Sequence, residues 1–240
     1  MSWNIVRQVF TAVWVTAMLL ISVTPRAESA QLDNGRVFLS YVNVKLDMDR
    51  YNNRLIERGM IEFETSYNGI GVGFYSFIRD RWSVGGELNY LLDNKRRVGV
   101  YQSAVSGTYG GLNIGYLAYR IHGLNIQPQF GINGGSVNLD IEALTPQDPS
   151  SPLGEGRGKV KMSSVQASLS LMLAMDYLWI MRRSDDGTGY GLVLGTSIGY
   201  QFSPWQGDWE SSGIELFDEP GIKLQGPQIR FSAGFGWGVE

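Results

Sequence analysis

Hydrophobic and polar residues alternate strictly along one stretch of the chain, LNIQPQFGIN at residues 124–133. Because side chains of a β-strand point alternately to its two faces, this pattern predicts a strand with one apolar and one polar face. The polar face carries amides and glycine instead of the lysine, glutamate and arginine that water favours most. The segment therefore fits a barrel wall whose polar face lines the interior and whose apolar face meets something other than water.

The same alternation recurs in enough segments to close a sheet. The most regular is residues 164–179, where Val, Ala, Leu, Met, Tyr and Trp share one parity and Gln, Ser and Asp occupy positions of the other. Each segment is long enough for a membrane-crossing β-strand of ~9 to 11 residues. The predicted strands are 37–46, 69–78, 82–91, 110–120, 124–133, 164–179, 190–202 and 227–237.

Two of these strands need a further interpretation. In the first, both parities carry apolar residues, and Asn43 and Lys45 indicate the inner face. In the fifth, the apolar set changes parity after Gly134 and Gly135, which predicts a glycine-containing β-bulge from which the strand continues. The new apolar set is Val137, Leu139 and Ile141.

The connections between the predicted strands alternate between short and long. This alternation is typical of an antiparallel transmembrane barrel whose termini and short turns are periplasmic and whose long loops are extracellular. The barrel must be closed, because lipid cannot satisfy an open sheet edge. We therefore predict an all-β fold, an eight-stranded antiparallel transmembrane β-barrel. Its short turns are 78–81, 121–123 and 182–189, and its long loops are 47–68, 92–108, 143–160 and 203–226.

Aromatic residues fall near both ends of the predicted strands, where a barrel meets the two membrane interfaces. Those near the short turns and those near the long loops would form two girdles. The predicted interface aromatics are Trp82, Trp179, Tyr190 and Trp237 near the turns, and Tyr90 and Tyr200, with Phe202, near the loops.

The start of the chain predicts export. Arg7 precedes an uncharged apolar run at residues 9–23, and small residues follow it. This is the composition of a secretory signal peptide, and the run is shorter than the ~20 residues of a membrane-anchoring helix, the alternative interpretation. We expect a signal peptide at residues 1–30, a barrel domain at 31–240 and, after cleavage, a location in the bacterial outer membrane.

The closing segment IRFSAGFGW, residues 229–237, adds to this pattern. With the signal peptide and the alternating segments, it resembles the small outer-membrane β-barrel proteins of Gram-negative bacteria, the porin-like superfamily that includes the OmpX, OmpW and OmpA-barrel types. The resemblance implies outer-membrane lipid as a partner and recognition of the last strand by the outer-membrane assembly machinery. The chain departs from the family in continuing past Trp237 instead of ending on an aromatic residue.

Composition excludes several classes of function. The formal net charge is −3 with no basic cluster, so nucleic acid is not expected as a partner. Cysteine is absent, which excludes disulfides and thiolate metal sites. Asp47 and Asp49 have the spacing that opens a calcium loop, but Tyr51 and Asn52 break the motif. We expect no metal and no cofactor.

Two features could suggest an enzyme. GTSIG at 195–199 matches the G-x-S-x-G nucleophile motif. That motif requires a strand-to-helix turn at the serine and a histidine later in the chain. Ser197 instead lies inside a predicted strand, and no histidine follows it. His122 is the single histidine and lies in a short turn. We therefore predict a protein that is not an enzyme, with a lipid-modifying outer-membrane enzyme as the alternative.

Charged residues on the inward parity form the candidate site. Glu87 and Arg230 would join a hydrogen-bonded network that plugs the barrel or gates a thin water path, because buried charges must be paired. The predicted function is structural, surface-binding or weakly pore-forming. A soluble lipocalin-type binding barrel is a further alternative, but it would need an apolar interior and a charged exterior. The predicted interior polar residues are Glu87, Arg230, Asp176, Gln127 and Gln129.

Overall fold

The computed structural model describes residues 34–57, 62–78, 81–98, 101–143, 159–185, 187–211, 214–216 and 221–238. The predicted signal peptide, residues 1–30, lies outside these described residues. Within the described ranges, no helix is both long and apolar enough to cross a membrane.

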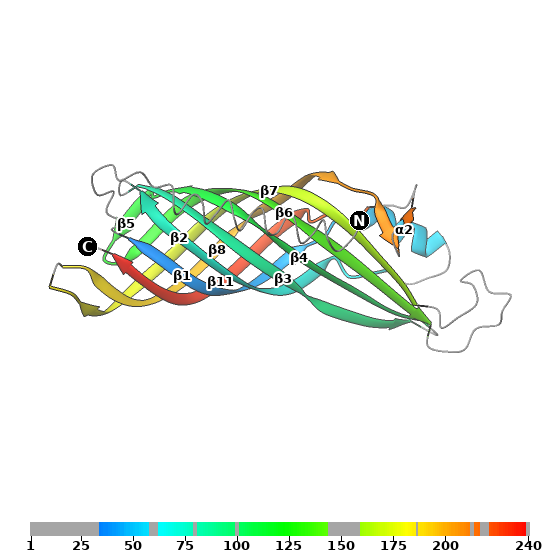
Figure 1. Cartoon of the computed structure of the whole chain (residues 1–240), viewed down its shortest axis with the longest axis horizontal. Coiled ribbons are helices and arrows are strands. Elements are labelled where there is room, and N and C mark those ends of the chain that lie inside the picture. Colours follow the sequence, from blue (N-terminus) through cyan, green and yellow to red (C-terminus); the bar gives the residue numbers. More distant parts are fainter. Residues whose placement is uncertain are drawn as a thin grey trace.

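The strand pairing closes eight strands into an antiparallel ring, which confirms the predicted fold class. Figure 1 shows the strands wrapped into a barrel. Each strand pairs with the next around the ring, and the last strand pairs with the first over ten residue pairs from Gly35↔Trp237 to Val44↔Gln228. The ring consists of β1 (Gly35–Lys45), β2 (Ser66–Ile78), β3 (Trp82–Val98), β4 (Tyr101–Tyr116), β6 (Leu124–Ala143), β7 (Lys159–Arg183), β8 (Gly189–Gln206) and β11 (Gly226–Gly238).

Four smaller elements lie at the two ends of the barrel. At the end with the short connections, the turn end, β5 (Tyr119–Ile121) pairs with the start of β6. At the opposite end, the loop end, helix α2 (Asp49–Glu57) lies in the connection between β1 and β2. There β9 (Trp209–Ser211) pairs with β10 (Ile214–Leu216) and, through Glu210 and Ser163, with the first residues of β7.

The half of the barrel near the turn end has an apolar outer surface and a polar interior. In β6, Phe130 and Ile132 are 46% and 61% exposed, whereas Gln127 is fully buried. This orientation confirms the inside-out prediction and is the reverse of a lipocalin-type barrel. The outward residues of this band include Val37, Leu39, Tyr41, Ile70, Val72, Phe74, Val84, Leu112, Ile114, Leu171, Leu173, Leu192, Leu194, Ile198, Ile229, Phe231 and Phe235.

The half near the loop end has an apolar interior instead of a polar one. This arrangement corrects the bulge predicted after Gly134 and Gly135. The pairing of β6 runs through both glycines without a shift of register toward β4 and toward β7. Val137 and Leu139 therefore keep the inward orientation of Asn133 and are fully buried. The apolar residues change parity because the interior changes from polar to apolar, while the strand itself continues regularly.

The first strand also has an apolar inner face near the loop end. The prediction that Asn43 and Lys45 mark its inner face was therefore wrong. Val42 and Val44 are buried inside the barrel, whereas Asn43 and Lys45 lie on the outer surface. Their outward position is explained by height, because this end of β1 lies beyond the apolar band and its outer face meets water.

The long connections are partly regular structure, which corrects the predicted loops. Residues 92–98 and 101–108, expected as a loop, extend β3 and β4. The predicted loop 203–226 contains the end of β8 as well as β9 and β10, and the loop 47–68 contains α2. The strands β3, β4, β6 and β7 thus extend far toward the loop end (Figure 1).

Candidate functional site

The interior near the turn end is filled by polar side chains, here called the polar layer. The interior of a barrel with eight strands is just wide enough for side chains to fill. The buried members of the polar layer are Arg36, Ser40, Ser83, Asn89, Asn125, Gln127, Gln129, Asn133, Ser168, Ser170, Asp176, Ser197, Gln201, Gln228 and Arg230.

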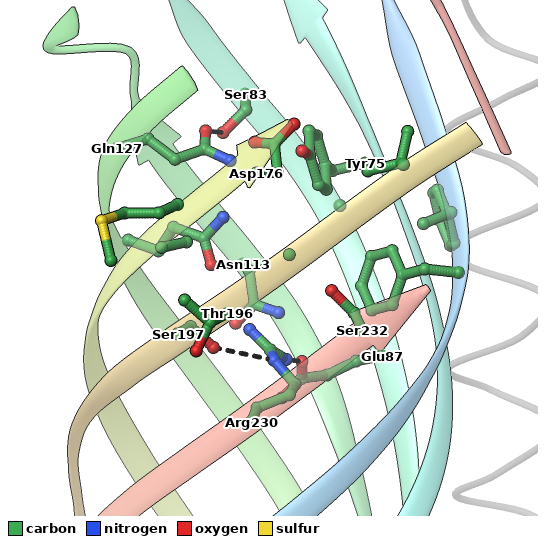
Figure 2. A pocket seen from close by; sticks show the side chains of 18 of the residues that line it. Tyr75, Ser83, Glu87, Asn113, Gln127, Asp176, Thr196, Ser197, Arg230 and Ser232 are labelled. Carbon is green, nitrogen blue, oxygen red and sulfur yellow. Dashed lines mark hydrogen bonds and ion pairs between the residues drawn. The ribbon is translucent and has the colours of Figure 1, made fainter. Parts of the chain in front are cut away.

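One buried ion pair joins Arg230 on β11 to Glu87 on β3, across the barrel interior. The Arg230 Nε also donates a hydrogen bond of 3.0 Å to the Ser197 Oγ on β8, and the guanidinium lies 5.9 Å from the ring centre of Phe38. Figure 2 shows Glu87, Arg230 and Ser197 converging on one point in the polar layer. The two charges compensate each other, which buried charges require.

A second ion pair joins Arg36 on β1 to Asp176 on β7, with Arg36 Nε 3.3 Å from Asp176 Oδ1. Asn125 Nδ2 donates to the same carboxylate oxygen at 3.1 Å. Arg36 Nη1 donates to the carbonyl of Trp237 at 2.7 Å and to that of Gly35 at 2.9 Å. Arg36 therefore connects the first strand, the last strand and β7, which lies two strands beyond β11 in the ring.

Gln127 and Gln129 lie in the polar layer between these ion pairs. Gln127 Oε1 accepts a hydrogen bond of 2.9 Å from Ser83 Oγ on β3. Both glutamines line a cavity of about 30 Å³ that also borders Tyr75 (Figure 2). A polar cavity of this size has room for ordered water but not for an organic substrate.

The interior near the loop end is filled by a hydrophobic cluster, here called the apolar plug. It receives side chains from strands around the ring, from α2 and from the segment before β11, so it crosses the whole interior. Its residues are Val44, Leu46, Met48, Tyr51, Tyr67, Leu91, Val105, Tyr109, Val137, Leu139, Met162, Trp209, Ile222 and Leu224.

Two buried side chains of helix α2, Tyr51 and Asn52, hold it over the apolar plug. Asn52 Nδ2 donates to the carbonyl of Phe63 at 3.0 Å, and the backbone N–H of Phe63 donates to Asn52 Oδ1 at 2.9 Å. Tyr51 packs against the Phe63 ring with the ring centres 5.8 Å apart. The helix and the segment before β2 therefore form a fixed cap on the barrel.

The predicted interface aromatics lie on the outer surface of the barrel. Trp82 packs edge-on against Tyr116, with ring centres 5.3 Å apart, and Arg81 donates a hydrogen bond of 3.0 Å to the Tyr116 hydroxyl. Trp237 is only partly exposed. Trp82, Tyr90, Trp179, Tyr190 and Tyr200 are all exposed.

Arg36 is a charged interior residue that the sequence pattern did not predict. The signal was available, because Val37, Leu39 and Tyr41 have outward parity, which places Arg36 and Ser40 inside. The polar pair Asn43 and Lys45 masked it by suggesting the opposite phase.

The two residues that could suggest an enzyme are not brought together. Ser197 lies inside the barrel and accepts the hydrogen bond from Arg230. His122 is exposed in the turn before β6, where its φ of 45° is left-handed. In the ranges that the structure describes, no group of three or more histidine, aspartate and glutamate side chains could hold a metal ion.

Comparison with known proteins finds similarity only among solved structures. No family model matches the sequence, and no curated protein matches it. The attachment invasion locus protein Ail of Yersinia pestis, in complex with the heparin analogue sucrose octasulfate, is 12% identical, with 85% of this chain and 98% of Ail covered and a TM-score of 0.46. Neisserial surface protein A is 10% identical, with 84% and 95% covered and a TM-score of 0.43.

The outer membrane protein OprG from Pseudomonas aeruginosa is 12% identical, with 85% of this chain and 93% of OprG covered and a TM-score of 0.36. These similarities are too distant to transfer a ligand or a role. The chain's own closed ring, apolar outer band and filled interior define it as an eight-stranded transmembrane β-barrel.

Proposed function

We propose that this protein is a closed outer-membrane barrel that does not conduct ions and that displays its loop-end extension on the cell surface. The observation that carries the proposal is the apolar plug, which crosses the interior above the polar layer. Ion conduction requires a continuous water-filled path lined by polar groups. An interior closed by packed aliphatic and aromatic side chains offers none.

The membrane and its sides are inferred from the architecture. Closed barrels with an apolar outer band are the form in which β-sheets cross bacterial outer membranes. Such barrels have short periplasmic turns and longer extracellular connections. The loop end, with α2, β9, β10 and the extended strands, would then be extracellular, and the turn end periplasmic.

The last strand supports a role in assembly. β11 pairs with β8 on one side and closes the ring with β1 on the other. Its outward residues Phe231 and Phe235 are exposed. We infer that this strand is what the outer-membrane assembly machinery recognises, even though the chain continues beyond Trp237.

The same structure supports a role other than catalysis. Ser197 accepts a hydrogen bond from Arg230 in the polar layer, and the cavity beside it has a volume of about 30 Å³. A lipid acyl chain would not reach it there. Purified protein in phosphatidylcholine vesicles should release no fatty acid and produce no modified lipid in mass spectra, and turnover that is lost in Ser197→Ala would overturn this part of the proposal.

Single-channel recording in planar bilayers tests the proposed closed state. We expect negligible current from the wild type and also from Arg230→Ala, because the apolar plug remains in place when the ion pair is broken. Steady, reproducible channel openings in the wild type would overturn the proposal. Openings only in Arg230→Ala would assign the closure to the ion pair instead of the apolar plug.

A further inference from the structure

A β-bulge in β3 re-aims two cationic side chains just above the apolar band. The register toward β4 shifts between Leu91 and Asn94. Below the shift, Tyr90 is exposed on the outer face, and Leu92 within the shift is exposed as well. Above the shift, Lys95 and Arg97 are exposed. A bulge changes which parity faces outward, so the shift presents both cations on the outer surface.

The neighbouring strands extend this surface with a third cation and a row of polar groups. Lys45 on β1 is exposed and pairs through its backbone with Ser66 on β2. Beside it, Asn43 Nδ2 donates to Asn68 Oδ1 at 2.8 Å and to Ser66 Oγ at 3.0 Å. The cationic face is defined here as Lys45, Lys95 and Arg97 with Asn43, Ser66 and Asn68.

The cationic face lies where a membrane changes from hydrocarbon to headgroups. On the same three strands, the apolar band ends at Tyr41, Ile70 and Leu92, all exposed. Beyond them the outer face is polar, so Lys45 and Lys95 follow within one or two outward positions. Lipid headgroups occupy the zone directly outside the hydrocarbon core.

The opposite wall of the barrel carries a different charge pattern at this end. On β6 and β7, exposed Lys161 pairs with Asp140 at 3.8 Å, and exposed Glu142 lies nearby on the same strand as Asp140. Among the described residues, Lys45, Lys95 and Arg97 make no comparable ion pair. Among the described side chains of β1, β2 and β3, the exposed charged ones are Lys45, Lys95 and Arg97, whereas the exposed Glu62 and Glu64 lie in the segment before β2.

We propose that the cationic face binds the phosphorylated saccharide headgroup of a glycolipid in the outer leaflet. β1 and β3 are two strand spacings apart, at least ~10 Å, so a headgroup with more than one anionic group would span the cations better than a single phosphate. The amide and hydroxyl groups between the cations suit sugar hydroxyls. The inference rests on the proposed function, because it needs the loop end to face the outer leaflet.

Co-purification from nanodiscs tests the inference. The wild type, the variant K45Q/K95Q/R97Q and the control variant R81Q/R182Q/R183Q would be inserted into phosphatidylcholine nanodiscs containing some diphosphoryl lipid A. The control removes the same charge from the turn end. After detergent extraction, mass spectrometry would count the lipid A retained per protein. We expect the wild type and control to retain it and the first variant to lose at least about tenfold.

Further arms separate the possible failures. Each protein is first inserted into nanodiscs of phosphatidylcholine alone, where a heat-dependent shift of its gel mobility shows that it is a folded, inserted barrel. If the wild type shows no such shift, the proposed function itself is contradicted. With insertion intact, equal lipid A retention by all three proteins would overturn the inference. The inference would also be overturned if the wild type retained phosphatidylglycerol as well as it retains lipid A. Release of lipid A by excess inorganic phosphate would overturn it too.

Discussion

Arg36 on the first strand of the ring hydrogen-bonds to the carbonyl of Trp237 on the last strand, with Nη1 2.7 Å from the oxygen. The same guanidinium pairs with Asp176 on β7. One side chain thus holds the seam between β1 and β11 closed and ties it to β7, two strands beyond β11 in the ring. The arrangement links closure of the barrel to the packing of its interior.

Replacing Arg36 with methionine should lower the free energy of unfolding by roughly 3 kcal/mol, because the buried carboxylate of Asp176 would lose its counter-charge. Urea titration of the barrel in lipid vesicles, followed by tryptophan fluorescence, measures the change. Arg81→Met, at an exposed arginine of the turn end, is the control and should leave the free energy of unfolding nearly unchanged, because an exposed charge contributes little to stability.

The double variant R36M/D176L separates charge burial from simple packing. Because it removes both buried charges, it should recover much of the stability lost in Arg36→Met. A double variant less stable than the single one would show that the contacts of Arg36 with the Gly35 and Trp237 carbonyls matter more than its ion pair.

The apolar plug predicts opposite accessibility for two adjacent residues of β6. Leu139 is fully buried and Asn138 lies on the outer face. Since the chain has no cysteine of its own, single variants Asn138→Cys and Leu139→Cys can be labelled without background. A water-soluble maleimide should react with the cysteine at 138 and much more slowly with that at 139. Faster labelling at 139 would mean that the strand does have the bulge that the structure lacks.

The height of the apolar band predicts where a charge on the outer surface is tolerated. Leu194 is 61% exposed within the band, whereas Asn43 faces outward beyond it. Leu194→Arg should destabilise the barrel in vesicles by about 2 to 4 kcal/mol, and Asn43→Arg by no more than about 1 kcal/mol. Equal effects in the urea titration would contradict the assigned band.

The cap over the apolar plug depends on Asn52 and its two hydrogen bonds to the Phe63 backbone. Asn52→Ala would leave both backbone groups without this partner, a loss of about 1 to 3 kcal/mol for the cap. We expect faster cleavage by added protease between residues 46 and 65, mapped by mass spectrometry. The neighbouring exposed residue gives the control Asn53→Ala, and an unchanged cleavage rate in Asn52→Ala would show that the cap is held elsewhere.

The sequence by itself determined the barrel. Alternation with a period of two shows that each strand has two unlike faces, and amides and glycines on the polar face of residues 124–133 show that this face does not meet bulk water. The inward parity of Glu87, Asp176 and Arg230 followed from the same alternation, because parity is a local property of a strand.

Only the tertiary structure decided whether a given face of a strand meets lipid, water or the barrel interior. Alternation does not distinguish an apolar face that meets lipid from one that meets a core, so Val137 and Leu139 were assigned to the wrong face. Their orientation depends on the strands across the barrel and on α2, which supply the apolar plug. The partner of Asp176 was decided in the same way, because Arg36 lies 140 residues earlier in the chain and only ring closure brings the two side chains together.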